Sequence, residues 1–303
     1  MSNTLSIDIC ICTFRRNHIR ETLASLSHLD IHPEWNIRII VADNDDTPSA
    51  RENVNSSALQ LPFEVLYIHA PARNISIARN ACLEAAHGDL VAFLDDDETA
   101  TSLWLKSLVE IQQREKAQAV LGPVNAIYSN HAPQWMKDGD FHSTQPVWVN
   151  GEIITGYTCN LLLDIQSGLF NDLRFSPALG KTGGEDTVFL HTLYKKGGKI
   201  SYAETALLNE PVPEGRASLI WLIKRRFRSG QTHALLLMND HGNNLKNKIF
   251  QIIKALLKAG ACFSASILFL LSPSKRAKWI LRGSLHVGVI ARLIGKKELV
   301  QYG

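Results

Sequence analysis

The sequence predicts an α/β fold, in which a mostly parallel sheet carries helices on both faces, followed by a basic helical C-terminal region. In the first half of the chain, short apolar runs of strand length alternate with segments of helical periodicity, as in parallel sheets. The run at residues 90–94 is apolar throughout, which is typical of a strand buried on both faces. After residue 215 the chain becomes basic, with one long apolar segment.

Composition excludes a disordered chain and reveals an uneven charge. The 303 residues are 45% apolar, enough to bury a full core in one large domain or two smaller ones. Residues 1–215 carry 16 Lys and Arg against 27 Asp and Glu, whereas residues 216–303 carry 16 against 2. Such asymmetry indicates a basic segment that meets an anionic partner, either membrane or nucleic acid. A solvated basic face on ordinary helices is the alternative.

The cysteines and the N-terminus indicate a reducing compartment. The cysteine count is odd and contains no Cys-x-x-Cys pair, so neither disulfides nor a structural zinc site is expected. The first residues lead directly into an apolar run without a basic n-region and apolar h-region, so no export signal is expected. Cys10 and Cys12 lie two residues apart, so they would share one face of a strand, and they are interpreted as small core residues. The five cysteines are Cys10, Cys12, Cys82, Cys159 and Cys262.

The expected elements follow one another in βαβ order. Strands are expected where apolar runs of strand length end in polar residues, and helices where apolar residues recur at three- and four-residue spacing. The alternation implies parallel strands with helices on both faces. The expected strands are 6–14, 37–43, 63–69, 90–94 and 119–124, and the expected helices are 19–29, 75–86 and 103–115.

Polar residues follow three of the expected strands, at the edge where open α/β sheets bind ligands. The three groups are residues 13–16, residues 43–45 and the aspartate triplet at 95–97. Three adjacent carboxylates repel one another, and a divalent cation would relieve that repulsion. Mg²⁺ and Mn²⁺ favour oxygen ligands, and Mg²⁺ is usually held by one or two carboxylates together with substrate phosphates. A solvated acidic loop or a helix N-terminus is the alternative.

Four blocks of the sequence resemble glycosyltransferase family 2, in order and in spacing. They are Ile-Cys-Thr-Phe-Arg-Arg at 11–16, Val-Ala-Asp-Asn-Asp at 41–45, Ile-Ser-Ile-Ala-Arg-Asn-Ala at 75–81 and Gly-Asp-Leu-Val-Ala-Phe-Leu-Asp-Asp-Asp at 88–97. The resemblance, which extends to bacterial surface-polysaccharide transferases, implies a GT-A fold. It also implies an inverting transferase that uses a nucleotide-sugar donor and Mn²⁺ or Mg²⁺, and we expect the donor to be a UDP-sugar. We expect a catalytic domain at 1–215, with a nucleotide-binding half at 1–125 and an acceptor-binding half at 126–215, followed by the basic region at 216–303.

The resemblance also implies roles for single residues. The triplet would be the family's DxD element, with Asp95 facing the ribose side and Asp97 the metal, and Asp96 could share either role. Two alternatives stay open: Asp43 could make only an Asx turn, and Arg79 could lie on the exposed face of its helix. The predicted donor-binding residues are Thr13, Arg15, Asp43, Arg79, Asp95, Asp96, Asn160, Arg225 and Arg228, and the predicted metal ligands are Asp97 and Asp95.

Residues 133–196 are where an acceptor would be handled. Trp135, Trp148 and Tyr157 could stack on sugar faces, although core packing explains the same residues. Asn160 precedes a Leu-Leu-Leu run that resembles the family's strand along the donor sugar.

A glycine-rich loop at 180–184 leads into Glu185 and Asp186, which open a helix running to residue 196. Acidic residues in a first turn also stabilise the helix dipole, which is the alternative reading of this pair. The resemblance assigns Asp186 as the general base that deprotonates the acceptor hydroxyl and Glu185 as its orienting neighbour.

The basic region begins with an amphipathic helix at 221–233. Its position resembles the family's basic motif facing the diphosphate, and Arg225 and Arg228 lie three residues apart on one face. The Gln-x-x-Arg-Trp form of processive synthases is missing, so synthesis of a long polymer is not expected. His233 is interpreted as a surface residue.

The most apolar region, residues 250–271, only approaches a spanning helix because Lys254, Lys258 and Gly260 interrupt it. Cations and a Trp at 275–282 follow, as in an interfacial helix. We expect a cytoplasmic enzyme attached peripherally to the inner face of the plasma membrane, acting on a lipid-linked saccharide. A helix hairpin packed on the catalytic domain is the alternative.

Two other classes of function compete with this interpretation. A nucleotidyltransferase could share the sheet and the carboxylates, but it usually begins with a Gly-rich phosphate loop, and residues 13–16 contain no glycine. A non-catalytic module could bind nucleic acid through residues 216–303. We expect a transferase that does not bind nucleic acid.

Overall fold

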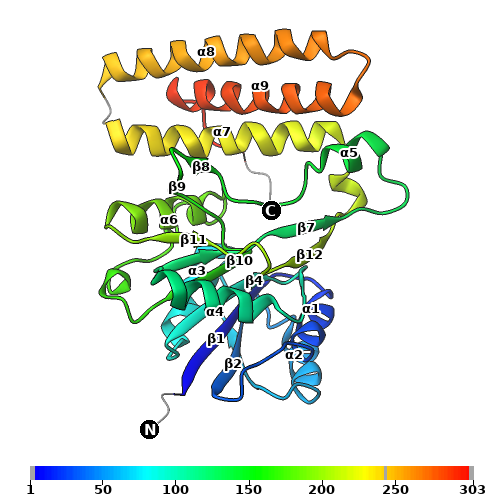
Figure 1. Cartoon of the computed structure of the whole chain (residues 1–303), viewed down its shortest axis with the longest axis vertical. Coiled ribbons are helices and arrows are strands. Elements are labelled where there is room, and N and C mark those ends of the chain that lie inside the picture. The colour runs from blue at the N-terminus through cyan, green and yellow to red at the C-terminus, as the bar shows by residue number, and fades with distance from the viewer. Residues whose placement is uncertain (1–3, 242–243, 300–303) are drawn as a thin grey trace. The chain divides into compact units, whose positions relative to one another are not determined.

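The computed structural model describes residues 4–241 and 244–299 (Figure 1). The chain forms two compact units. The first holds the chain up to Ala126 together with Ser143–Pro211, and the second holds Ile127–His142 together with the chain from Val212 onward. The segment Ile127–His142 thus packs with the C-terminal helices, whereas the sequence places it in an acceptor half. The domain boundary at residue 215 stays a prediction.

The first unit is built on a seven-stranded sheet of order β11–β6–β10–β4–β1–β2–β3. The strands β3, β2, β1 and β4 are parallel neighbours, and β11 is parallel to β6. Only β10, among the paired strands of this sheet, runs antiparallel to both of its neighbours. The strands are β1 (Leu5–Thr13), β2 (Trp35–Asp43), β3 (Glu64–His69), β4 (Leu90–Asp95), β6 (Ala119–Leu121), β10 (Asn160–Asp164) and β11 (Ile200–Tyr202).

Helices cover both faces of this sheet, as predicted. The side chains of β1 alternate between the faces: Ile7, Ile9 and Ile11 pack on one side, and Cys10 and Cys12 on the other. All five cysteines are free thiols, and the two on β1 are core residues. The first face is covered by α1 (Ile19–Leu26), α2 (Arg51–Ala58) and α4 (Trp104–Glu115), and the second by α3 (Ile75–Ala85) and α6 (Glu185–Lys195).

Two differences from the predicted elements have physical causes. Helix α2 gives no periodic signal because Val54 is its one buried residue. The strand predicted at 119–124 is broken at Gly122 and Pro123, after which the chain joins a separate three-stranded sheet. That sheet consists of β5 (Thr99–Ala100), β12 (Leu208–Pro211) and β7 (Val124–Ile127), and a small hairpin consists of β8 (Trp148–Val149) and β9 (Glu152–Ile153).

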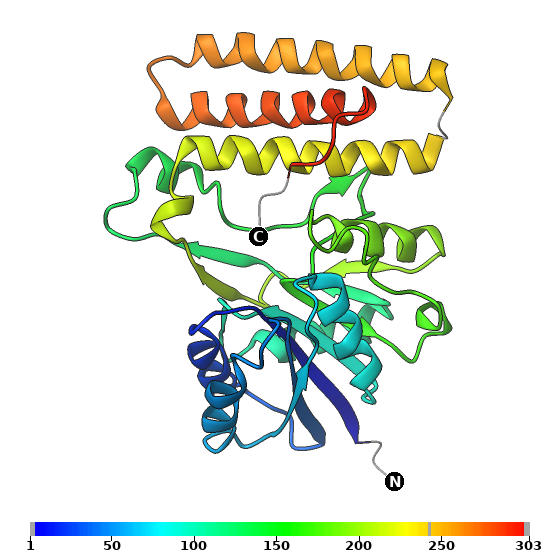
Figure 2. The ribbon, with the colours of Figure 1, turned by 180° about the vertical axis from the view of Figure 1, so that it is seen from behind.

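Three long helices dominate the second unit, and Figure 2 shows α9 lying between α7 and α8. The contact of α7 with α9 depends on glycine. A Cβ on Gly230 would lie 1.9 Å from the carbonyl oxygen of Leu285, and one on Gly288 would lie 1.9 Å from that of Phe227. The two backbones therefore touch where no side chain fits. The helices are α7 (Leu219–His241), α8 (Leu245–Leu268), α9 (Pro273–Leu293) and the short α5 (Gln134–Gly139), which packs against α9.

Candidate active site

Three strand ends bring the predicted polar groups to one edge of the sheet. Thr13 ends β1 and lies in register with Asp43 at the end of β2, while Asp95 at the end of β4 lies in register with Cys12. Because the three strands are parallel neighbours, their carboxyl ends share one edge. The structure thus brings these groups together where the sequence places them.

An acidic turn, Asp95–Glu98, follows β4. The backbone N–H of Asp95 donates to Glu98 Oε2 at 2.8 Å, and the N–H of Glu98 donates to the Asp95 carbonyl at 3.2 Å. Glu98 is 1% exposed, and this burial raises the pKa of its carboxyl well above the usual range. The sequence does not predict a role for Glu98, because its carboxyl group cannot be distinguished there from those of the three preceding aspartates.

Asp96 points into the protein. Its Oδ2 accepts a 2.7 Å hydrogen bond from the Thr13 hydroxyl, and its Oδ1 lies 3.3 Å from Arg16 Nη1. Burial raises the pKa of Asp96 to about 7. The predicted donor contacts of Thr13 and Asp96 stay predictions, and in this structure the two side chains bind each other.

Two consecutive arginines, Arg15 and Arg16, contact carboxylates of different loops. Arg15 has a left-handed backbone (φ 55°), and its Nε and Nη2 each lie 2.9 Å from Asp45 Oδ1. This contact lowers the pKa of Asp45. Arg16 instead pairs with both Asp96 and Asp97. The sequence predicts that Arg15 binds the donor, whereas in the structure it is Arg16 that contacts the acidic turn. The left-handed backbone at Arg15 points the two neighbouring side chains to different partners.

Arg79 joins the acidic turn to the helix that carries Asp186. Its Nη2 lies 3.6 Å from Asp95 Oδ1, and its Nη1 donates to Glu185 Oε1. The residue is 6% exposed, so the alternative that Arg79 lies on an exposed helix face is wrong. The neighbouring Asn80 exchanges two 2.9 Å hydrogen bonds with the backbone of Phe175, and therefore also points inward.

Glu185 and Asp186 form the first turn of α6, behind the left-handed Gly184 (φ 83°). Glu185 is buried, and its Oε2 has no hydrogen-bond partner within residues 4–241 and 244–299. Asp186 Oδ1 accepts a 2.6 Å hydrogen bond from the N–H of Thr187. Burial, together with the charge of Glu185, raises the pKa of Asp186 to about 6. A carboxylate with a pKa near neutrality is suited to general-base chemistry.

Two residues that are predicted to contact the donor, Asp43 and Asn160, form hydrogen bonds with protein groups. Asp43 is fully buried and accepts hydrogen bonds from Asp45 N at 3.1 Å, Ala50 N at 2.8 Å and the Tyr67 hydroxyl at 2.7 Å. The hydrogen bond from Asp45 N is the contact expected if Asp43 makes an Asx turn, which is the alternative given above. Asn160 is equally buried, and its amide bonds the Trp104 indole and the carbonyls of Pro123 and Ala206, each at 2.8 Å. Both have a structural role, and their donor contacts stay predictions.

The predicted residues of the second unit have their own partners. Arg225 lies 5.5 Å from the centre of the Trp221 ring and donates to the His142 carbonyl at 3.4 Å. Arg228 is buried and donates to the Thr232 hydroxyl at 2.9 Å. Trp135 packs within the apolar cluster of this unit. Contact of Arg225 and Arg228 with a diphosphate stays a prediction.

The remaining aromatic candidates belong to the first unit and differ in exposure. Trp148 is exposed on the β8–β9 hairpin, and is therefore free to meet a ligand. Tyr157 donates its hydroxyl to the Gly122 carbonyl at 2.7 Å, as a core-anchored tyrosine does.

The acidic turn fits a cation that is shared with a diphosphate. Among the described residues, no group of three or more His, Cys, Asp or Glu side chains could enclose a metal ion. The turn does offer Asp95 and Asp97, whose side chains are 41% and 16% exposed. Mg²⁺ sites need only one or two carboxylates when substrate phosphates complete the coordination.

Comparison with known proteins identifies relatives of this fold and site. Residues 8–166 match the family model of Glycosyl transferase family 2. The chain is 50% identical over 303 residues to the succinoglycan biosynthesis protein ExoM of Rhizobium meliloti (strain 1021), covering all of this chain and 97% of that protein. It is 23% identical over 254 residues to the glucosyl-dolichyl phosphate glucuronosyltransferase of Haloferax volcanii, covering 77% of each. The mannosyltransferase PcManGT of Pyrobaculum calidifontis, solved with GDP-Man and Mn²⁺, has a TM-score of 0.65 at 15% identity, over 98% of this chain and 89% of that one.

The mostly parallel sheet with helices on both faces defines a GT-A fold. The chain belongs to glycosyl transferase family 2 and is a glycosyltransferase related to polysaccharide biosynthesis proteins. The predicted family and fold are thereby confirmed. The two competing classes, a nucleotidyltransferase and a nucleic-acid-binding module, receive no support from these relatives.

Proposed function

We propose that this protein is an inverting, divalent-metal-dependent glycosyltransferase. It moves a sugar from a nucleotide-sugar donor to a hydroxyl of a lipid-linked saccharide during surface polysaccharide synthesis. The observation that carries the proposal is Arg79, which contacts both Asp95 of the acidic turn and Glu185 beside the candidate base. Donor activation and proton removal would thus take place on the two sides of the buried Arg79 side chain.

The residues of the chain would divide the reaction between them. Asp186 accepts the proton of the acceptor hydroxyl while that oxygen forms a bond to the anomeric carbon. The bond from the anomeric carbon to the diphosphate oxygen breaks on the opposite side, and the nucleoside diphosphate leaves with the electron pair. A cation bound at Asp95 and Asp97 would neutralise the charge of the leaving diphosphate. The mannosyltransferase of similar fold was solved with GDP-Man and Mn²⁺, which supports such a cation. Glu185, paired with Arg79, would hold the start of α6 and with it the position of Asp186.

A panel of UDP-, GDP- and other nucleotide-linked sugars tests this function. In the presence of Mn²⁺, the correct donor should raise the melting temperature and be slowly hydrolysed. A ligand at 100 times its Kd stabilises the folded state by about 2.7 kcal/mol. We expect a UDP-sugar, although the mannosyltransferase was solved with GDP-Man, so both bases belong in the panel. If no nucleotide sugar stabilises the protein or is cleaved, the proposed function fails.

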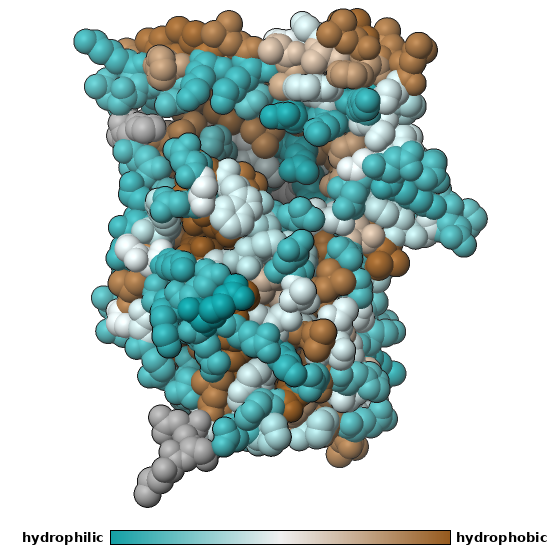
Figure 3. Space-filling model, viewed as in Figure 1, coloured by the Kyte–Doolittle hydropathy of each residue, from teal (hydrophilic) through white to brown (hydrophobic). Residues whose placement is uncertain are grey.

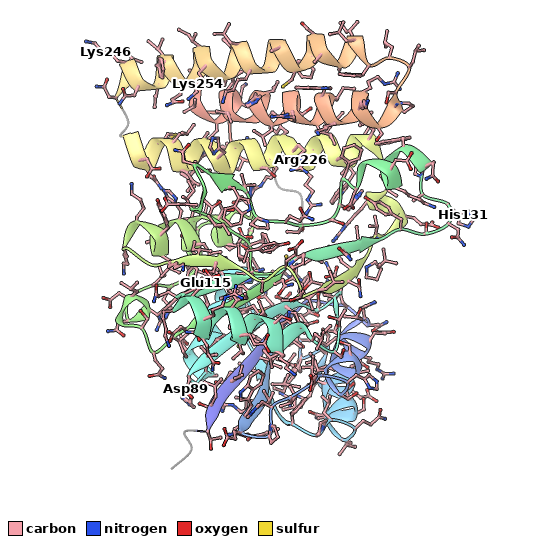
Figure 4. The ribbon with its side chains drawn as sticks, in the orientation of Figure 1. Asp89, Glu115, His131, Arg226, Lys246 and Lys254 are labelled. Carbon is pink, nitrogen blue, oxygen red and sulfur yellow. The ribbon has the colours of Figure 1, made fainter. Side chains whose placement is uncertain are left out.

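The second unit offers a surface suited to a membrane interface. Among the described helices, α8 is the one long and apolar enough to cross a membrane by length and composition. Its outward side chains are exposed, with Phe250 at 62% and Leu257 at 70%, and Figure 3 shows apolar residues gathered along this helix. Lys246 and Lys254 lie on the same helix (Figure 4). Helix α8 packs along its length on α9 and has an apolar outer side with cations beside it. Such a helix is typical of proteins that bind a membrane with the helix lying in the plane of its surface.

We therefore place the enzyme at the inner face of the plasma membrane, as a peripheral cytoplasmic protein with a lipid-linked acceptor. Helix α9 adds four further cations near its start, at residues 275–282. The Haloferax relative is named for a dolichyl phosphate-linked sugar, which supports an acceptor of this kind. Each cation near an anionic surface contributes about 1 kcal/mol to binding.

Vesicle sedimentation tests the membrane surface. The full-length protein should sediment with anionic vesicles, less so at high salt, and the Phe250→Asn/Leu257→Asn variant should stay in the supernatant while still binding donor. Leu59→Asn is a matched control, because Leu59 is 89% exposed but lies on the first unit. It should sediment like the parent. If the parent ignores vesicles of every composition, the membrane assignment is wrong and a soluble acceptor replaces it.

A further inference from the structure

Two arginines contact the carboxylates of the acidic turn. Arg16 Nη1 lies 3.3 Å from Asp96 Oδ1 and also contacts Asp97, while Arg79 lies 3.6 Å from Asp95. The three aspartates raise the pKa of Arg16, against the opposing effect of its own burial. A guanidinium therefore stands at Asp97, the carboxylate that the proposed function assigns to the divalent cation.

A guanidinium and a divalent cation cannot share one carboxylate at low cost. Like charges a few ångströms apart repel by about 4 kcal/mol per unit charge product at an effective dielectric constant near 20. Metal alone would have to take Asp97 from Arg16, and the guanidinium would then keep only its 3.3 Å contact with Asp96. A metal that arrives with a nucleoside diphosphate brings a further anionic partner, because a guanidinium fork suits phosphate oxygens.

The backbone restricts this competition to one of the two arginines. The left-handed conformation of Arg15 directs its guanidinium to Asp45, 2.9 Å away, whereas Arg16 is directed to the acidic turn. A left-handed residue other than Gly or Asn costs about 1–2 kcal/mol, so the surrounding contacts must hold it. The two neighbours thus have the same charge and different partners.

We propose that Arg16 is a placeholder cation, which occupies Asp97 until the donor arrives and makes metal binding depend on the donor's diphosphate. This inference rests on the proposed function, because it takes Asp97 as the metal ligand. Metal alone then binds weakly, and metal with nucleoside diphosphate binds tightly. Arg16 is a positioning residue in this scheme, since it acts by controlling access of the cation to Asp97.

Titration with Mn²⁺, followed by the electron paramagnetic resonance signal of the free ion, tests the proposal without any turnover. The full-length parent, Arg16→Gln and Arg15→Gln are compared without nucleotide and with UDP or GDP. Arg16→Gln should bind Mn²⁺ alone roughly tenfold more tightly than the parent, equivalent to about 1.4 kcal/mol. Arg15→Gln removes the same charge one residue away and should bind Mn²⁺ alone as the parent does. Nucleotide should tighten Mn²⁺ binding more in the parent than in Arg16→Gln.

The outcomes separate this inference from the function on which it rests. Equal or weaker Mn²⁺ binding by Arg16→Gln, in a parent that binds Mn²⁺ with nucleotide, overturns the placeholder and leaves the metal-dependent enzyme intact. If no protein binds Mn²⁺ under any condition, both proposals fall. Should Arg16→Gln fold poorly, Arg16→Met keeps an unbranched side chain and removes the charge that contacts Asp96 and Asp97 through Nη1. It should bind Mn²⁺ more tightly than the parent, and parent-like binding would contradict the proposal.

Discussion

Replacing Asp97 by Asn is expected to abolish sugar transfer and the Mn²⁺-dependent part of donor binding, while the protein stays folded. The amide keeps the size of the side chain but removes the charge that a cation needs. Cation stabilisation of a leaving diphosphate is worth several kcal/mol, so the rate should fall by roughly 10³-fold or more. The fold should tolerate the change because Asp97 lies in a turn whose backbone is held by Glu98. Turnover with a matched donor and a Mn²⁺ titration measure the two effects.

Asp172→Asn is the control for the lost charge. Asp172 is exposed and belongs to the same unit, so its replacement should leave transfer and Mn²⁺ binding unchanged. Full activity of the parent in EDTA would contradict the role of Asp97, and so would an Asp97→Asn variant that responds to Mn²⁺ as the parent does.

The sheet could be predicted because its strands are continuous apolar runs. The run at 90–94 has no polar interruption, and the neighbouring strand β1 is buried from Ile7 to Thr13. What the sequence could not show are elements without their own hydrophobic pattern. Helix α2 has one buried residue, and β7 follows a Gly-Pro break within what reads as a single strand.

The site was predictable at the level of strand ends and less so at the level of side-chain partners. Thr13, Asp43 and Asp95 meet at one edge because parallel strands end together. Whether Arg15 or Arg16 contacts the acidic turn depends on backbone geometry, here the left-handed conformation of Arg15. Asn160 is predicted from the sequence to contact a ligand, but its side-chain amide is hydrogen-bonded to protein groups. These partners come from distant segments of the chain, so the sequence pattern around Asn160 does not show them.

Replacing Asp186 by Asn is expected to lower the transfer rate by roughly 10²-fold or more with donor affinity unchanged, because the amide cannot accept the acceptor's proton. Loss of a first-turn carboxylate costs a helix only about 0.3–1 kcal/mol, so the fold should persist. Single-turnover rates and donor titrations separate the two readouts. Loss of donor binding together with unfolding would show that Asp186 serves the helix rather than the reaction.

The pH dependence distinguishes a base from any other use of the same carboxylate. The pKa of Asp186 is raised to about 6, first by burial and then by the charge of Glu185. Below that pH the carboxyl keeps its proton and cannot act as a base, so the rate of the parent should fall tenfold per pH unit as pH drops below about 6 and should be level above it. The same shift makes folding less favourable as pH rises from about 4 to 6, since the folded state binds the proton more tightly than the unfolded chain does. Glu185→Gln removes the neighbouring negative charge and should move the fall in rate to lower pH. In Asp186→Asn the residual rate should lose this acid limb, and an unchanged limb would assign the titration, and with it the base, to another group.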